Sequence, residues 1–236
     1  MISAPIPANE SARMAALRAF DILDSGAEQS YDDLTRIAAH ICQTPKALIT
    51  LIADDRQWFK SRFGMALTET TRDEAFCAHT ILDTHPMIVP DATLDPRFAA
   101  NPHVTAPDGI RFYAGAPLMT RDGFGMGSLC VIDERPRELS AAQIEALEAL
   151  SRQVVRLMEF RRTSTELAGA LRDIKTLEGL IPMCANCHRV REDDKYWRGV
   201  DAWMSAHTDV MVSHAICPDC MHKLYPEFAG PDGEVR

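Results

Sequence analysis

The sequence contains no run approaching the ~20 apolar residues that a membrane-spanning helix requires. Its first residues, MISAPIPANESARM, lack the basic segment followed by an apolar run that marks a secretory signal. The net charge is -9, and no basic stripe is present that would hold nucleic-acid phosphates. We therefore expect a cytoplasmic protein that binds neither membrane nor nucleic acid.

Motifs typical of several enzyme and DNA-binding classes are also missing. There is no glycine-rich phosphate loop, no serine elbow, no His-Glu-x-x-His pair and no helix-turn-helix pattern. The residues after position 178 are too few for a kinase or cyclase domain. We therefore expect that the chain is not an enzyme.

The composition supports a globular core. Hydrophobic residues make up 46% of the sequence, which is enough to bury a core. The length of 236 residues suits one domain of about 150 residues and a smaller unit. In the cytosol, the seven cysteines are expected to stay reduced or to hold metal.

Residues 111–133 organise the predicted domain. Two apolar runs, residues 112–119 and 126–132, lie on either side of Asp122-Gly123, a pattern typical of a β-hairpin. We predict that this hairpin is the central antiparallel pair of a sheet. Glycines also occur at positions 115, 125 and 127, and glycine within a strand marks a bulge or a close backbone approach. Either a packed helix or a small ligand would explain them.

Hydrophobic periodicity places the remaining elements of this domain. We predict helices over residues 11–23, with Ser11 as cap, 31–41 and 74–82, and strands over residues 47–53, 57–63 and 87–89. Residues 91–109 are rich in Asp, Pro, Asn and Gly and too long for a passive connection, which indicates a lid or binding loop.

A long helix is predicted over residues 140–178. Ser140 and Gln143 form a capping-box pattern at its start. Apolar residues then keep a spacing of three and four, and the spacing resumes with a shifted phase after Ser164, at Leu167, Leu171 and Ile174. We interpret the first half as packed on the sheet and the second half as paired with a second copy of the chain. The alternative is a helix folded back on its own domain.

Two Cys-x-x-Cys steps, Cys184/Cys187 and Cys217/Cys220, are the sharpest chemical signal. Two such steps provide the four thiolates of a closed tetrahedral Zn2+ site. The gap between them predicts a small insert with a helix near residues 200–207. A segment this short buries little surface, and metal binding supplies the missing free energy of folding.

Other interpretations use the same residues. Cys184 to His188 matches the c-type haem attachment pattern, although no export signal accompanies it. Cys217 and Cys220 also resemble a thiol redox pair. A histidine is a further possible metal ligand in place of a cysteine, the candidates being His188, His207, His214 and His222.

The ordered motifs of residues 10–160 resemble the GAF family of bacterial sensory domains. They are RQWFKSRFG at 56–64, ETTRDEAFCAHTIL at 69–82, VPDATLDPRF at 89–98, NPHV at 101–104, IRFYAGAPL at 110–118 and GSLCVID at 127–133. The resemblance implies an α+β fold: a six-stranded antiparallel sheet, helices on its faces and a cavity roofed by the long loop. The tail is similar to short segments with IP-C-x-x-C and SH-x-I-C-P-x-C that follow sensory and receiver domains in bacterial signalling proteins.

Four segments are therefore expected. They are a GAF-like sensory domain over 1–139, whose final helix continues to about 160, a long signalling or coiled-coil helix over 140–178, a zinc-stapled module over 179–228 and a disordered tail over 229–236.

The resemblance also supplies candidate pocket residues. They are Trp58, Phe76, Cys77, His79, Asp91, Arg97, Arg111, Tyr113 and Cys130. The two arginines either anchor an anionic ligand or pair with Asp91 and Asp95 to hold the long loop. Bilin-binding relatives carry Cys directly before His, whereas Ala78 intervenes here, which argues against chromophore attachment.

These observations predict a bacterial sensor or adaptor. Its GAF domain binds an unknown small ligand or a partner, its helix forms a homodimer, and its zinc module contacts another signalling protein, such as a histidine kinase or response regulator. The alternative is a thiol oxidoreductase or redox sensor, similar to free methionine sulfoxide reductase, that uses Cys77 and Cys130 or the tail cysteine pairs. A buried cysteine is also commonly an inert small hydrophobe.

Overall fold

The computed structural model describes residues 1–178, 181–191, 196–207, 213 and 215–228. The chain divides into two compact units, Met1–Gly169 and Ala170–Arg236. In the described part of the chain, every helix is too short or too polar to cross a lipid bilayer.

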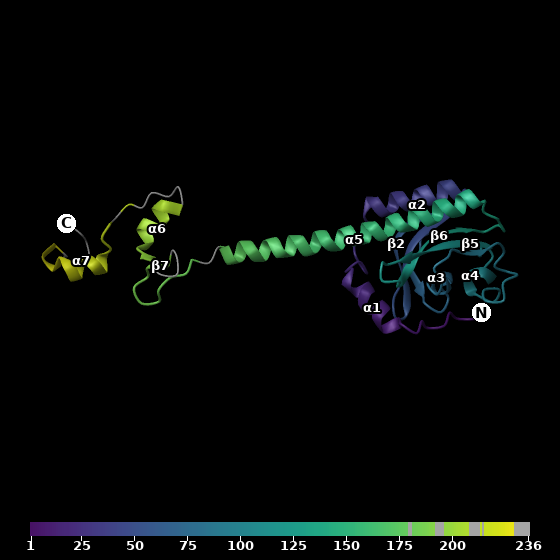
Figure 1. Cartoon of the computed structure of the whole chain (residues 1–236), viewed down its shortest axis with the longest axis horizontal. Coiled ribbons are helices and arrows are strands. Elements are labelled where there is room, and N and C mark those ends of the chain that lie inside the picture. Colours follow the sequence, from purple (N-terminus) through teal and green to yellow (C-terminus); the bar gives the residue numbers. More distant parts are fainter. Residues whose placement is uncertain (179–180, 192–195, 208–212, 214, 229–236) are drawn as a thin grey trace. The chain divides into compact units, whose positions relative to one another are not determined.

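The first unit is built on a six-stranded antiparallel sheet with the order β3-β2-β1-β6-β5-β4 (Figure 1). Its strands are β1 (Lys46–Ile52), β2 (Arg56–Phe63), β3 (Glu69–Thr71), β4 (Met87–Val89), β5 (Phe112–Met119) and β6 (Gly125–Asp133). The predicted hairpin is confirmed as β5 and β6, but the central pair of the sheet is β1 and β6, not the hairpin. Strand β6 lies at the centre of the sheet because it also pairs with β1.

Helices cover both faces of this sheet (Figure 1). They are α1 (Glu10–Ala19), α2 (Gln29–Cys42), α3 (Phe76–Thr80), α4 (Pro102–Thr105) and α5 (Ala141–Glu178). Residues of α1, α2 and the first half of α5 form one core cluster with the sheet, and residues of α3 and α4 form a second cluster.

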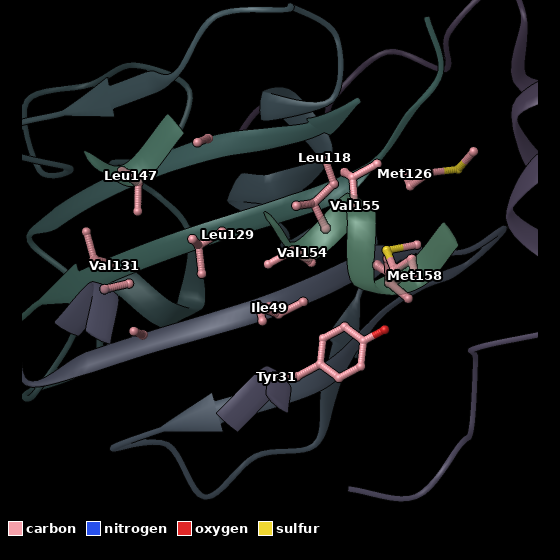
Figure 2. Packing of buried hydrophobic residues seen from close by; sticks show 14 of the residues in the cluster. Tyr31, Ile49, Leu118, Met126, Leu129, Val131, Leu147, Val154, Val155 and Met158 are labelled. Atoms are coloured by element: carbon pink, nitrogen blue, oxygen red, sulfur yellow. The ribbon is translucent and has the colours of Figure 1, made fainter. Parts of the chain in front are cut away.

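Burial on both faces explains why the central strands consist of nearly continuous apolar runs. Successive side chains still alternate: Leu129 and Val131 of β6 belong to the cluster with α5, whereas Cys130 and Ile132 belong to the cluster with α3. Figure 2 shows Leu129 and Val131 among the residues that pack with Leu147, Val154 and Met158 of α5. Each residue of β6 therefore contacts one layer or the other.

The predicted start of the long helix is confirmed. The Ser140 backbone N–H donates to Gln143 Oε1 at 2.9 Å, and the Gln143 backbone N–H donates to Ser140 Oγ at 3.3 Å. This reciprocal pair is a capping box. The helix then continues as one element to Glu178, and Leu167 and Leu171 in its second half are exposed.

Several local predictions are corrected. Helix α1 begins at Glu10, so Ser11 is not its cap, and Asn9 at that position makes no side-chain cap. The helix predicted over residues 74–82 is shorter, because α3 spans Phe76–Thr80. The segment predicted as a long loop contains α4, whose start is capped by the side chain of Asn101. Strand β3 was missed.

The strand glycines mark close backbone approaches, as predicted. A Cβ atom on Gly127 would lie 1.8 Å from the carbonyl oxygen of Thr50, and one on Gly125 would lie 2.6 Å from that of Ile81. Gly127 therefore lets β1 and β6 pair closely, and Gly125 lets the end of α3 approach the sheet.

The second unit contains short elements. They are β7 (Val190–Arg191), β8 (Trp197–Arg198), α6 (Val200–His207), α7 (Pro218–Leu224) and a 3-10 turn (Pro226–Phe228). The helix predicted near residues 200–207 is confirmed. Among the described residues of this unit, Val190 is the only buried hydrophobic side chain. The predicted disordered tail, residues 229–236, lies outside the described residues.

We predict that Gly127→Ala lowers the free energy of unfolding by about 3 kcal/mol, because the added methyl group overlaps the backbone of β1. Gly169→Ala is the control, since a Cβ atom there meets nothing within 4 Å and alanine favours the helix by about 1 kcal/mol. Urea denaturation measures both. Equal stability of the two variants would contradict this account of the sheet.

Candidate functional site

A cavity of about 40 Å3 lies between the sheet and the segments that carry α3 and α4. Apolar side chains from β1, β2 and β6 form much of its wall. Four of the nine predicted pocket residues line it, namely Phe76, Cys77, Tyr113 and Cys130. The cavity thus brings together four of the nine predicted residues, and the other five do not line it.

Part of the cavity lining is polar. Gln57 is 6% exposed, and its Nε2 donates weakly to Thr70 Oγ1 at 3.4 Å. Within the described part of the chain, its Oε1 has no hydrogen-bond partner. Glu74 and His103 also line the cavity, with His103 Nε2 3.3 Å from a Glu74 carboxylate oxygen. A buried acceptor without a donor favours a small polar occupant with an N–H or O–H group.

Two cysteines, Cys77 and Cys130, also line the cavity. The Cys77 and Cys130 Sγ atoms are 3.8 Å apart, and the Tyr113 hydroxyl donates to Cys77 Sγ at 3.3 Å. The hydroxyls of Thr80 and Ser128 lie 2.7 and 3.3 Å from the Tyr113 oxygen. All five side chains are buried. The hydroxyls therefore form a hydrogen-bonded chain that ends on the Cys77 sulfur.

Gly115 makes this arrangement possible. It follows Tyr113 by two residues on β5, and a Cβ atom on it would lie 2.1 Å from the Tyr113 hydroxyl oxygen. Gly115 also pairs with Cys130 across the two strands. The missing side chain therefore leaves the space in which the phenol reaches the thiols.

The three buried cysteines have thiols with different pKa values, because their surroundings differ. Burial acts to raise the pKa of the Cys77 thiol, but hydrogen bonds from Cys130, Ser128, Thr50 and Tyr113 lower it to about 7. The hydrogen bond to Cys77, together with burial, raises the pKa of Cys130 well above its usual value. Burial alone raises the pKa of Cys42 to about 11. Cys77 is therefore the most readily ionised of the three buried thiols.

The two predicted arginines hold the loop. Arg97 donates to both carboxylate oxygens of Asp95, at 3.0 and 2.7 Å. Arg111 donates to the carbonyl oxygen of Val104 at 2.8 Å. Asp91 instead accepts hydrogen bonds from Thr93. The loop-holding interpretation therefore describes these contacts, with Asp95 and a backbone carbonyl as the partners.

The remaining two predicted residues lie away from the cavity. His79 Nε2 is 3.1 Å from the carbonyl oxygen of Ile2, and its ring packs edge-on against Phe98. Trp58 belongs to the core cluster on the opposite face of the sheet. Strand alternation accounts for this, because Gln57 and Phe59, on either side of Trp58, face the cavity.

The first tail cysteine pair lies in a turn, and the second lies at the start of α7. Backbone N–H groups of Cys187 and Asn186 hydrogen-bond to the Cys184 sulfur and lower its pKa. The N–H group of Cys220 does the same for Cys217. His188, the residue directly after Cys187, has a left-handed φ of 55°. Among the described residues, no three His, Cys, Asp or Glu side chains are grouped so that they could hold a metal ion. The four-cysteine zinc site therefore stays a prediction.

Sequence reasoning missed the polar partners of the cavity. Gln57, Thr80 and Ser128 were not predicted, although each stands one or two residues from an apolar position of the same element. Period-two alternation along β2 and β6 would have placed Gln57 and Ser128 beside Phe59 and Cys130. No pattern in the sequence pointed to Thr80.

A GAF domain family model matches residues 27–157. The chain is 41% identical over 166 residues to a cyclic di-GMP phosphodiesterase of Pseudomonas aeruginosa, a match that covers 70% of this chain and 28% of that relative. It is similar to the GAF domain of an Acinetobacter phosphoenolpyruvate-protein phosphotransferase, with a TM-score of 0.50, 18% identity and coverage of 66% of this chain and 96% of that one. It is also similar to free methionine-R-sulfoxide reductase of Neisseria meningitidis, with a TM-score of 0.48, 15% identity and coverage of 70% and 99%.

The Pseudomonas relative corrects one prediction. The missing catalytic motifs led us to expect that the chain is not an enzyme, but a relative with 41% identity is named for a phosphodiesterase activity. The expectation was wrong because it treated the absence of known motifs as the absence of catalysis. The chain spans only 28% of the length of that relative.

We predict that Cys77 reacts with a small thiol reagent along a pH profile whose midpoint lies near 7, because the thiolate is the reactive form. Tyr113→Phe removes a donor to that thiolate and should move the midpoint upward by about one unit. Cys42 is an internal control, buried to a similar degree but with a midpoint near 11. Peptide mass spectrometry after timed labelling measures both sites. Coincident profiles for Cys77 and Cys42 would refute the assignment.

Proposed function

The chain belongs to the GAF domain family, and on this premise we propose that it is the sensory part of a cytoplasmic bacterial signalling protein that controls cyclic di-GMP hydrolysis. A small molecule in the cavity is the input, helix α5 is the relay, and the tail is a zinc-binding module that contacts another signalling protein. The observation that carries the proposal is the cavity with its unpartnered Gln57 oxygen, within a domain whose 41% identical relative is named for cyclic di-GMP hydrolysis.

The size of the cavity limits the ligand. Sites for cofactors and drug-sized molecules have volumes of about 300–1,000 Å3. At about 40 Å3, this cavity is far too small for a dinucleotide, so cyclic di-GMP is not its occupant. The ligand is a molecule of a few heavy atoms that donates a hydrogen bond to Gln57 Oε1.

In the proposed relay, a change at the cavity reaches helix α5 through β6, whose successive side chains point to opposite faces of the sheet. Cys130 lines the cavity, and its neighbours Leu129 and Val131 pack in the cluster with Leu147 and Val154 of α5. A ligand shifts the helix only to the extent that it binds one arrangement of these strands more tightly than the other. The cavity and helix α5 thus lie on opposite faces of strand β6.

Helix α5 also offers a dimer surface. Phe160, Leu167 and Leu171 are 72%, 59% and 52% exposed and follow one another at steps of seven and four residues. This spacing places apolar side chains on one helical stripe, which a second copy of the chain would cover. Light scattering of the full chain tests this step, and a monomer at micromolar concentration would contradict it.

The small amount of apolar surface that the tail buries supports the zinc module. Among its described residues only Val190 is a buried hydrophobic, so apolar burial alone does not stabilise it. Each cysteine pair already turns backbone N–H groups toward its first sulfur, an arrangement suited to a metal-bound thiolate. We propose that Zn2+ draws the two pairs together.

Expression of the full chain in bacteria tests the function. We predict that the level of cyclic di-GMP changes at least about twofold relative to empty vector, through a phosphodiesterase that the chain contacts, and that Gln57→Leu, which removes the cavity acceptor, abolishes this effect. Gln153→Leu, an exposed position on α5, is the matched control. Mass spectrometry of extracts measures the nucleotide. An unchanged cyclic di-GMP level would contradict the proposed control of hydrolysis. An effect that persists in Gln57→Leu would contradict the cavity as the ligand site.

Zinc is tested separately by elemental analysis. We expect about one zinc per chain, released by Cys184→Ser or by Cys217→Ser but retained in Cys42→Ser. After chelation the tail should become sensitive to protease while residues 1–169 stay resistant, because metal binding stabilises only the small unit. Metal-free protein with a protease-resistant tail would rule out the zinc module.

A further inference from the structure

We propose that Cys77 and Cys130 are an oxidation site, at which a hydroperoxide that enters the cavity converts the two thiols into a reversible disulfide. This inference goes beyond the proposed function and does not depend on it, because the bond can form whether or not α5 relays a signal.

The two sulfurs are already close. Their separation is 3.8 Å, and a disulfide needs about 2.05 Å, so about 1.8 Å must be closed. Side-chain rotation together with a small shift of α3, a helix of five residues, can supply this movement. Cys130 is held at the centre of the sheet by two neighbouring strands. Bond formation would therefore draw α3 toward the sheet.

Cys77 is the attacking group. A buried thiol without polar contacts is inert, as expected for Cys42. Cys77 instead receives the Tyr113 hydroxyl hydrogen bond and lies beside the Cys130 thiol, and both contacts stabilise a thiolate. Cys130 keeps its proton and is placed to attack next. The geometry thus assigns different roles to the two cysteines.

The cavity selects the oxidant. Both cysteines line it, so a small oxidant inside lies next to both residues. A single water occupies about 10–15 Å3 by the same measure, so about 40 Å3 admits hydrogen peroxide, which has two heavy atoms. A bulky disulfide such as oxidised glutathione does not fit. The oxidant class is therefore a small hydroperoxide.

The chemistry balances. The Cys77 thiolate attacks one peroxide oxygen, the O–O bond breaks, and the leaving hydroxide takes up the proton that Cys77 released on ionising, which forms water. Sulfur is oxidised to a sulfenic acid while the peroxide is reduced. The Cys130 sulfur then attacks the Cys77 sulfur, the S–O bond breaks, and hydroxide leaves with the Cys130 proton as a second water. Two thiols and one hydrogen peroxide thus give one disulfide and two waters.

Peptide mapping of the full chain tests the proposal. The protein is treated with hydrogen peroxide, its free thiols are blocked, and it is digested with trypsin without reduction. We expect a disulfide between peptides 73–97 and 122–137, reversed by dithiothreitol, while Cys42 in peptide 37–46 stays reduced. Because detection is site-specific, oxidation of the tail cysteines does not interfere.

Two variants sharpen the result. Tyr113→Phe should slow cross-linking about tenfold at pH 7, because the thiolate loses a donor. Cys130→Ser should instead accumulate a Cys77 sulfenic acid, which dimedone traps when the oxidised protein is denatured in its presence. Oxidised tail cysteines without the 73–97 to 122–137 link in native wild-type protein would overturn the proposal. A link that forms only in urea would overturn it as well.

Discussion

Burial of the central sheet on both faces is the constraint on which the rest of the structure depends. Because α5 covers one face and α3 the other, every residue of β6 and all of β5 except Met119 are buried. A polar group that faces inward must find its partner within the core. This explains why Tyr113, Thr80 and Ser128 bond to one another and why the chain of hydroxyls ends on a cysteine sulfur.

The same constraint connects the cavity to the long helix. Adjacent residues of β6 point to opposite layers, so Cys130 touches the cavity while Leu129 and Val131 touch the α5 layer. A tightly packed core does not deform gradually, and a shift on one face is accommodated by repacking on the other. The helix therefore needs no direct contact with a ligand in order to respond to one.

The sequence was informative wherever local chemistry decides the structure. Ser140 with Gln143 predicted the start of α5, and the glycines within β6 predicted close backbone approaches that the structure has. Prediction was weaker for the site, because a pocket depends on which face a side chain takes. Trp58 looked like a pocket residue but faces the other core, and its neighbour Gln57 was overlooked. Arg97 could have served a ligand or the loop, and only the position of Asp95 shows the contact it makes.

Amide hydrogen exchange of the full chain, before and after treatment with hydrogen peroxide, tests most directly whether the two faces of the sheet are coupled. We predict slower exchange in α3 together with a change within residues 147–158 of α5, because these segments pack on opposite sides of β6. A change confined to α3, with identical exchange along α5, would show that the cavity and the helix are independent and would contradict the relay.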